Sequence, residues 1–197
     1  MLILDFDLDF VVRPIRRGAA DQLGRYENPE ITVWSKYDFQ SFLENRMVLS
    51  RADKVAGQTC EHHKEVFFHV QNLITSGVLV PPFHWVHVDA HDDIQGCSDA
   101  VKINSANFIL HLIGKDWIQH LDFVLPNGED RPPECLIKWS PLRIEFANHK
   151  TTIEYKDEVL YKLQRKPDFV FLTRSPDFTP IIADELFEMA TNYINLK

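Results

Sequence analysis

The chain has 197 residues, of which 45% are hydrophobic and 25% are charged, so it can enclose one substantial core. We expect a single domain over residues 1–197. Lys and Arg number 21 against 29 Asp and Glu, which gives a formal net charge of −8 at pH 7. Nucleic acids and anionic membranes require a basic face, so this balance argues against both as partners. It is compatible with a cationic substrate or with metal ions.

The N-terminal segment and the cysteines indicate a cytoplasmic protein. The first ten residues place three Asp inside an apolar stretch, whereas a secretory signal has a basic segment followed by an apolar one. No apolar run approaches the roughly 18–20 residues that span a bilayer. The three cysteines, Cys60, Cys97 and Cys135, are widely spaced and odd in number, which is typical of a reduced, cytosolic chain.

Strands and helices are expected to alternate along the chain. Residues 2–12 are rich in β-formers and alternate in polarity, which predicts a strand, and the Pro and Gly residues of 13–31 predict a long loop or lid. Apolar spacing and capping residues predict helices over 38–51, 61–76, 104–113, 154–164 and from Thr179 to about Ile194, and strands over 83–88, 135–138 and 168–173. This order indicates an α/β sheet that binds its ligands at the carboxyl ends of its strands.

The segment from Val86 to Asp93 carries the strongest sign of chemistry. It is an apolar strand that ends in Asp-Ala-His-Asp-Asp. In an extended chain alternate side chains point the same way, so Asp89, His91 and Asp93 would face one place and Asp92 another. Four ionisable side chains in five residues are costly after a buried strand unless they bind something. The pattern predicts a metal site, and the alternative is an exposed polar turn.

A second row of carboxylates lies near the N-terminus. Asp5, Asp7 and Asp9 alternate with apolar residues, so a strand would carry them on one face, where they would repel one another without a cation. The segment does not fit an EF-hand loop beginning at Asp5, because its sixth position is Phe10 instead of Gly and its twelfth is Arg16 instead of Glu. An edge strand with a solvated acidic face is the alternative.

Two adjacent histidines, His62 and His63, stand at the start of the helix predicted over residues 61–76. Each could be a metal ligand or an exposed residue near the helix N-terminus. Sites rich in oxygen ligands with one or two imidazoles suit Mn²⁺ or a similar cation, and many carboxylates allow two metals about 3.5–4 Å apart. Such a pair makes hydroxide available at neutral pH.

Two of these motifs resemble those of the arginase and ureohydrolase superfamily. DAHDD resembles its Asp-Ala-His-x-Asp motif and FDLD resembles its Ser-x-Asp-x-Asp motif, although here the second motif comes first in the chain. With EHHKEV at 61–66 and TRSPDFTP at 173–180, the sequence is more similar to a compact arginase-like family that includes peptide arginases. The resemblance implies a compact, single-domain, three-layer α/β/α fold with a mainly parallel sheet and permuted motif order.

The resemblance also implies a dinuclear manganese centre, with two Mn²⁺ per chain. Asp5 stands where arginases have Ser, and it would support the ligands from behind or replace one of them. The arginase Gly-Gly-Asp-His segment is absent, which leaves the choice between His63 and His62 open. The implied ligands are Asp7, Asp9, His63 (or His62), Asp89, His91 and Asp93.

Two further segments would hold the substrate. Asn-Ser-Ala-Asn at 104–107 resembles the arginase Ser-Gly-Asn-x-His-Gly stretch and implies substrate contacts from Ser105 and Asn107, while Ile109 stands at the position of its histidine. In TRSPDFTP, Asp177 could pair with a guanidinium, and Arg174 could pair with a carboxylate or organise a loop. The alternative is a Ser-Pro-Asp turn with Arg174 in a surface or structural ion pair.

The combined expectation is a Mn²⁺-dependent peptide arginase, which converts arginine residues of a precursor peptide to ornithine and releases urea. Hydroxide that bridges the metals would attack the guanidinium carbon, with Asp93 and His91 as catalytic residues. One alternative is a phosphatase of the haloacid-dehalogenase type, in which Asp5 or Asp7 attacks phosphorus. Another is a non-catalytic, metal-stabilised protein that binds an arginine-bearing partner.

Overall fold

The structure is a computed structural model that describes residues 1–14, 31–91, 93–94, 102–126, 142–146 and 149–197. Its strands are β1 (Leu2–Asp7), β2 (Val12–Arg13), β3 (Thr32–Val33), β4 (Val55–Cys60), β5 (Phe83–Val88), β6 (Ile118–Leu125), β7 (Leu142–Phe146), β8 (His149–Asp157), β9 (Phe169–Thr173) and β10 (Ile194–Leu196). Eight of them form one sheet in the order β10-β4-β9-β1-β5-β6-β8-β7, and β2 pairs with β3 separately. Within the large sheet every neighbouring pair is parallel except β7 with β8.

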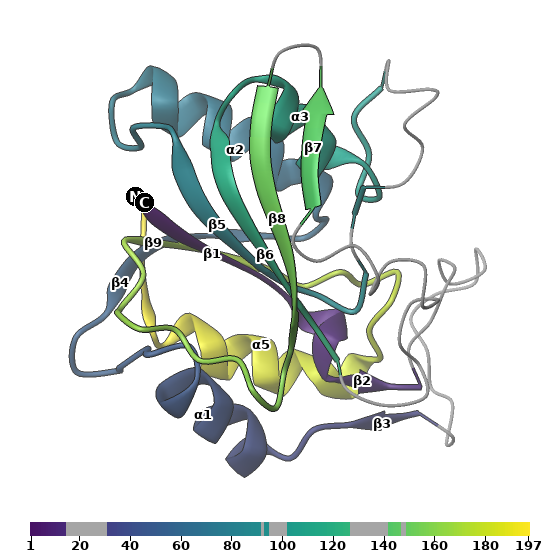
Figure 1. The fold of residues 1–197 in the computed structure, drawn as a ribbon. Coiled ribbons are helices and arrows are strands. Elements are labelled where there is room, and N and C mark those ends of the chain that lie inside the picture. The colour runs from purple at the N-terminus through teal and green to yellow at the C-terminus, as the bar shows by residue number, and fades with distance from the viewer. Residues whose placement is uncertain (15–30, 92, 95–101, 127–141, 147–148) are drawn as a thin grey trace.

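Helices cover both faces of this sheet (Figure 1). One apolar core lies beneath α1 (Lys36–Asn45) and α5 (Asp184–Thr191), and a second lies beneath α2 (Lys64–Thr75) and α3 (Phe108–Gly114). Two 3-10 helices, η1 (Leu8–Val11) and η2 (Ile181–Ala183), follow β1 and precede α5. The predicted three-layer α/β/α fold with a mainly parallel sheet is confirmed. No helix in the described ranges has the length and apolar character needed to cross a membrane.

Strand β1 lies inside the sheet, and all six of its residues are buried. Its even-numbered residues join the core beneath α1 and α5, and Ile3 joins the core beneath α2 and α3. Asp5 and Asp7 share the face of Ile3, because alternate side chains of a strand point the same way. The sequence therefore places two carboxylates in a buried layer, where they need partners.

Four adjacent strands end at the same level of the sheet. Asp7 at the end of β1 pairs in register with Thr173 at the end of β9, which pairs with Cys60 at the end of β4. On the other side, Phe6 pairs with Val88, the last residue of β5. Because these strands are parallel, the segments that follow them meet at one edge, where ligands bind in sheets of this kind.

The helix predicted over residues 154–164 is wrong. Residues up to Asp157 belong to β8, and the connection from 158 to 168 contains no helix. The apolar residues that suggested a helix do not share a buried face, since Leu163 is 4% exposed and Leu160 is 81% exposed. Residues 160–165 instead line a cavity against the sheet.

Other boundaries also differ from those predicted. The strand predicted over 2–12 ends at Asp7, whose side chain accepts a hydrogen bond from the Asp9 amide as the chain turns into η1. The final helix ends at Thr191, because Ile194 joins the sheet beside β4. Helices α1, α2 and α3 are shorter than the predicted 38–51, 61–76 and 104–113. Most of the predicted loop over 13–31, and the strand over 135–138, lie outside the described residues.

Candidate metal centre

The carboxyl ends of β4, β9, β1 and β5 surround a cavity of about 280 Å³. The lining combines acidic and imidazole groups with small polar ones. It consists of Asp7, Asp9, His63, Asp89, His91, Asp93, Asn104, Ser105, Ala106, Ser175 and Phe178. All six residues implied as metal ligands are therefore brought together, and they come from the end of β1 and from the segments after β1, β4 and β5.

Three carboxylates meet at one nitrogen of this cavity. Nδ1 of His63 lies 2.9 Å from Oδ2 of Asp7 and 3.0 Å from Oδ2 of both Asp89 and Asp93. An imidazole nitrogen carries at most one proton, so it cannot donate to three oxygens, and this one has no hydrogen-bond partner of suitable geometry among the described residues. Neighbouring ligands of an octahedral cation with bonds of about 2.0–2.1 Å are about 2.9 Å apart. The spacing matches that of a coordination shell.

Asp5 holds two histidine rings from behind. Its Oδ1 lies 3.0 Å from Nε2 of His63, and its Oδ2 lies 2.8 Å from Nδ1 of His87 and accepts a hydrogen bond from the Trp85 indole at 3.3 Å. Each ring therefore directs its other nitrogen towards the centre, and Nε2 of His87 lies 3.1 Å from Oδ2 of Asp89. Carboxylates commonly fix histidine ligands in this way. Both oxygens of Asp5 are engaged by these contacts, so its geometry is that of the support and not of the replacement ligand.

His87 is a candidate ligand that the sequence analysis missed. It is fully buried, and with His63, Asp89 and Asp93 it forms a group whose potential ligand atoms lie within 4.8 Å of one another. The signal was present in the sequence, because His87 stands two residues before Asp89. Alternate side chains of a strand point the same way, so the argument that related Asp89 to His91 also relates His87 to Asp89.

Asp9, Asp89 and His91 form a second group with potential ligand atoms within 4.8 Å. Nδ1 of His91 lies 2.9 Å from Oδ2 of Asp9 and 3.4 Å from Oδ1 of Asp89. Asp89 thus belongs to both groups, with Oδ1 beside His91 and Oδ2 beside His63 and His87. These buried groups could hold metal ions.

The chain does not stay extended after β5. Strand β5 ends at Val88, the Asp89 carboxylate accepts a hydrogen bond of 2.7 Å from the His91 amide, and Asp93 has a positive φ of 48°. The predicted convergence of these residues is present, but the extended chain invoked for it is not. Asp92 lies outside the described residues.

Burial and close contacts shift the pKa values of the centre. Burial raises the pKa of Asp93 to about 6, with a further contribution from the charge of Asp89. Burial by itself would lower the pKa of His91 and His87, but the neighbouring carboxylates outweigh it and raise these values to about 12 and about 10. Without metal, protonated histidines therefore compensate the acids. Metal ions must displace those protons to bind.

Ser175 is another residue of the centre that was not predicted as part of it. It follows β9, has a positive φ of 48°, and its hydroxyl donates a hydrogen bond to Oδ2 of Asp7. This contact ties the segment after β9 to the end of β1. A polar residue after the predicted strand 168–173 was the available signal, since the ends of parallel strands meet.

Three more predicted residues, His62, Asp177 and Arg174, lie outside the cavity lining, as Asp5 does. His62 and Asp177 pair with each other at 3.5 Å, with side chains 38% and 56% exposed. Nε of Arg174 lies 3.5 Å from Oε1 of Glu61, and its guanidinium lies over the ring of Phe187. His63 and not His62 occupies the centre, and Arg174 takes the role of a structural ion pair.

The two predicted substrate contacts from residues 104–107 separate in the structure. Ser105 lines the cavity and accepts a hydrogen bond from the Lys64 amide at 3.4 Å. Asn107 is 2% exposed and does not line it. Its amide group bonds to the backbone of Asn104 and Lys102, at 2.8 and 3.1 Å, and so fixes the turn before α3.

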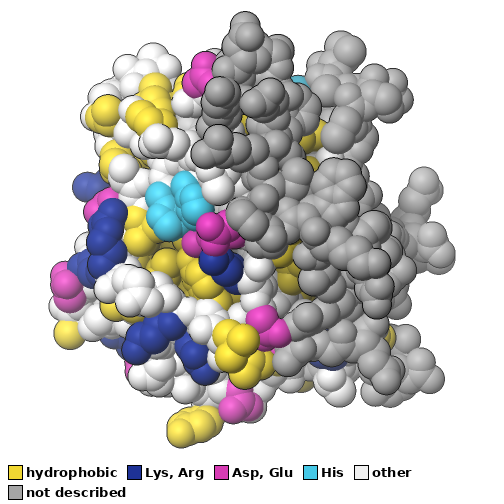
Figure 2. Space-filling view, viewed as in Figure 1, with side chains coloured by type: hydrophobic (Ala, Val, Ile, Leu, Met, Phe, Trp, Pro, Cys, Tyr) yellow, Lys and Arg dark blue, Asp and Glu magenta, His cyan; other side chains and the backbone are white. Residues whose placement is uncertain are grey.

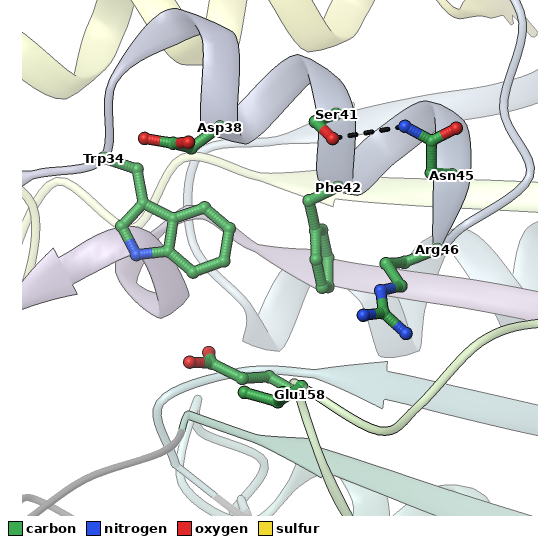
Figure 3. Close-up of a pocket in the computed structure, with 8 residues that line it drawn as sticks. Trp34, Asp38, Ser41, Phe42, Asn45, Arg46 and Glu158 are labelled. Atoms are coloured by element: carbon green, nitrogen blue, oxygen red, sulfur yellow. Dashed lines mark hydrogen bonds between the residues drawn. The ribbon is translucent and has the colours of Figure 1, made fainter.

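A separate hollow of about 390 Å³ lies beside α1 (Figure 3). The rings of Trp34 and Phe42 lie on one side of it with Arg46 next to Phe42, and Glu158 lies opposite the rings. None of the residues predicted for the metal centre lines this hollow.

Comparisons with protein-family models, with curated proteins and with solved structures found no match for the chain. The chemistry of the site is therefore inferred from the positions and charges of its own residues. Among the described residues that line the cavity there is no Lys or Arg. An acidic, buried cavity of this kind attracts cations and repels phosphate groups.

Proposed function

We propose that the chain is a metal-dependent hydrolase that converts arginine residues of a peptide to ornithine and releases urea. The convergence of three carboxylates on Nδ1 of His63, inside an acidic cavity, is the observation that carries this proposal. Carboxylates combined with imidazoles suit Mn²⁺, which we propose as the metal. The resemblance of the DAHDD and FDLD segments to arginase motifs adds support.

We propose two manganese ions per chain, with Asp89 shared between them. This carboxylate presents one oxygen to each of the two groups, which suits a pair of ions about 3.5–4 Å apart. When bound, such ions supply hydroxide at neutral pH, because they lower the pKa of coordinated water. The residues that would hold them are Asp7, Asp9, His63, His87, Asp89, His91 and Asp93.

The charge of the cavity favours an arginine residue as substrate. Its carboxylates attract a guanidinium, and the Ser105 hydroxyl offers a polar contact at the wall. Recognition of free arginine would also require a cationic partner for the α-carboxylate, and the described lining contains no Lys or Arg for this purpose. An internal arginine of a peptide has no α-carboxylate, so the lining favours a peptide.

Hydrolysis breaks the bond between the guanidinium carbon and Nε of the arginine residue. The nitrogen stays on the ornithine side chain and gains a proton, while the oxygen of water leaves in urea. We assign this proton transfer to His91, because its ring lines the cavity and is 21% exposed, so it can exchange protons with solvent. Nδ1 of His91 lies 2.9 Å from Asp9 and would hold a metal ion with it, so the proton would pass through Nε2 of the ring. Asp93 would orient the attacking water.

A phosphatase of the haloacid-dehalogenase type receives less support. Asp5 is fully buried and both of its oxygens are held by histidines, so it cannot attack phosphorus. The carboxylate of Asp7 accepts hydrogen bonds from the Asp9 amide and from Ser175. No Lys or Arg among the described lining residues would bind a phosphate.

The test is to incubate the Mn²⁺-loaded protein with arginine-containing peptides and, separately, with free arginine. We expect urea and loss of one CH₂N₂ unit from the peptide by mass spectrometry. The matched variants are His63→Ala, expected to be inactive, and His62→Ala, expected to be active. A fully loaded protein that leaves both substrates unchanged contradicts the proposal. In that case, a metal-dependent rise in melting temperature would favour the binding protein, and hydrolysis of a phosphomonoester with Mg²⁺ would favour the phosphatase.

A further inference from the structure

A second group of metal-ligating side chains lies on the opposite face of the sheet. His84 of β5 pairs in register with His120 of β6, and Asp122 lies two residues further along β6, so the three share one face. We call them the β5–β6 cluster. His84 and His87 are three residues apart in one strand and therefore point to opposite faces. The cluster is thus separate from the metal centre.

Both histidines of the β5–β6 cluster approach the same carboxylate. Nε2 of His84 lies 3.0 Å from Oδ2 of Asp122, and Nε2 of His120 lies 3.2 Å from Oδ1. The Tyr161 hydroxyl donates a hydrogen bond of 2.8 Å to Oδ2. The Asp122 side chain is 6% exposed, whereas those of His84 and His120 are 42% and 31% exposed. A buried carboxylate therefore lies below two accessible imidazoles.

The spacing of these groups is compatible with zinc binding. Their potential ligand atoms lie within 4.8 Å of one another. In a tetrahedral zinc site with bonds of about 2.0–2.1 Å, ligand atoms are about 3.3 Å apart, and two histidines with one carboxylate form a known zinc ligand set. Burial raises the pKa of Asp122, but hydrogen bonds from His84 and Tyr161 outweigh it and hold the pKa below its usual range. The carboxylate is therefore ionised at neutral pH.

The β5–β6 cluster faces a cavity of about 730 Å³, which residues 160–165 also line. On the face shown in Figure 2, histidine side chains lie at the surface beside acidic and basic ones. Lys156 of β8 lies 4.0 Å from Oδ1 of Asp122, but it pairs more closely with Glu154. Arg165, which also lines the cavity, pairs with Asp168 at 2.9 Å, so neither of these two cations has Asp122 as its nearest partner.

We propose that the β5–β6 cluster binds one Zn²⁺ ion, in addition to the ions of the metal centre. His84, His120 and Asp122 supply three ligands, and the cavity leaves room for water to complete the shell. The ion joins two neighbouring strands and, through Tyr161, the connection from β8 to β9. It therefore stabilises the pairing of β5 with β6 and the connection from β8 to β9.

The first test compares zinc content in variants of the full chain. The variants His84→Gln and His120→Gln keep an amide that can donate a hydrogen bond to Asp122 but is a poor zinc ligand. They therefore separate hydrogen bonding to Asp122 from zinc binding. His111→Gln, at a half-buried histidine of α3, is the matched control. After saturation with Zn²⁺ and removal of excess metal, we expect one zinc per chain fewer in the first two variants only. Equal zinc contents in all four proteins would overturn the proposal.

The second test needs no variant and so does not depend on folding of altered chains. The wild-type protein is treated with diethyl pyrocarbonate, with and without saturating Zn²⁺, and modified histidines are identified by mass spectrometry. Zinc should protect His84 and His120, whereas His62, with a similar exposure of 38%, should continue to react. Unchanged modification of His84 and His120 would overturn the proposal.

Discussion

The metal centre and the β5–β6 cluster use the same residue types on opposite faces of one sheet, but their polar atoms differ in whether they have hydrogen-bond partners. In the centre, Nδ1 of His63, Nε2 of His87 and Oδ2 of Asp89 are buried without hydrogen-bond partners of suitable geometry. In the cluster, both oxygens of Asp122 accept hydrogen bonds from groups around them. Buried polar groups without partners are costly, so we expect an added cation to stabilise the centre more than the cluster.

The number of carboxylates explains this difference. The cluster sets one carboxylate against two imidazoles, whereas the centre sets four carboxylates, Asp7, Asp9, Asp89 and Asp93, against the three imidazoles of His63, His87 and His91. Burial strengthens the repulsion between the acids. We therefore expect tight, function-linked binding in the centre and weaker, stabilising binding in the cluster, and four predictions test that contrast.

The largest expected effect belongs to His63→Ala. Removing the ring at which three carboxylates converge should reduce Mn²⁺ affinity and urea release by more than the roughly 100-fold that marks the upper range for residues that only orient a ligand. Calorimetric titration with Mn²⁺ and a urea assay would measure both. The neighbouring His62→Ala should remain close to wild type, and equal losses in the two variants would contradict the assignment.

Asp5→Asn should lower Mn²⁺ affinity by about 10–100-fold, because Asp5 fixes the rings of His63 and His87 without lining the cavity. Trp85→Phe is the matched control, since it removes another hydrogen bond to the same carboxylate and leaves the rings untouched. Calorimetric titration separates the two variants. A change in melting temperature with unaltered affinity would show that Asp5 serves the fold alone.

The pH dependence of the metal-free protein should differ from that of the Mn²⁺-loaded protein. The pKa of His87 is raised from 6.5 to about 10 in the folded chain, so its proton stabilises the fold fully below pH 6.5 and this contribution is lost as the pH rises through about 10. The metal-free melting temperature should therefore fall between pH 7 and 10, and bound Mn²⁺ should reduce the fall. Scanning calorimetry measures both melting temperatures. An equal fall with and without Mn²⁺ would contradict this prediction.

The smallest effect is expected for Tyr161→Phe, which removes one hydrogen bond to Asp122 from the β5–β6 cluster. We expect the free energy of unfolding to fall by about 1 kcal/mol, with zinc stoichiometry unchanged, because Tyr161 is not a ligand. Urea denaturation and elemental analysis measure the two quantities. Loss of the zinc itself would show that the hydroxyl takes a direct part in binding.

The sequence by itself determined the layered fold and most of the metal centre. Alternating strands and helices predicted an α/β sheet, and the acidic residues within segment 2–12 and after strand 83–88 predicted that Asp7, Asp9, Asp89, His91 and Asp93 gather at one edge. These predictions succeeded because side-chain alternation and the common direction of parallel strands are local and topological properties.

Tertiary structure alone decided the remaining assignments. His62 and His63 are adjacent in sequence, and only the start of α2 against β1 buries one and exposes the other. Asp5 became a support because two rings, one from the N-cap of α2 and one from β5, reach its two oxygens. Residues 154–164 have the spacing of a helix, but pairing of β8 with β6 made part of them a strand. Each of these outcomes depends on contacts between residues distant in sequence, which local patterns do not encode.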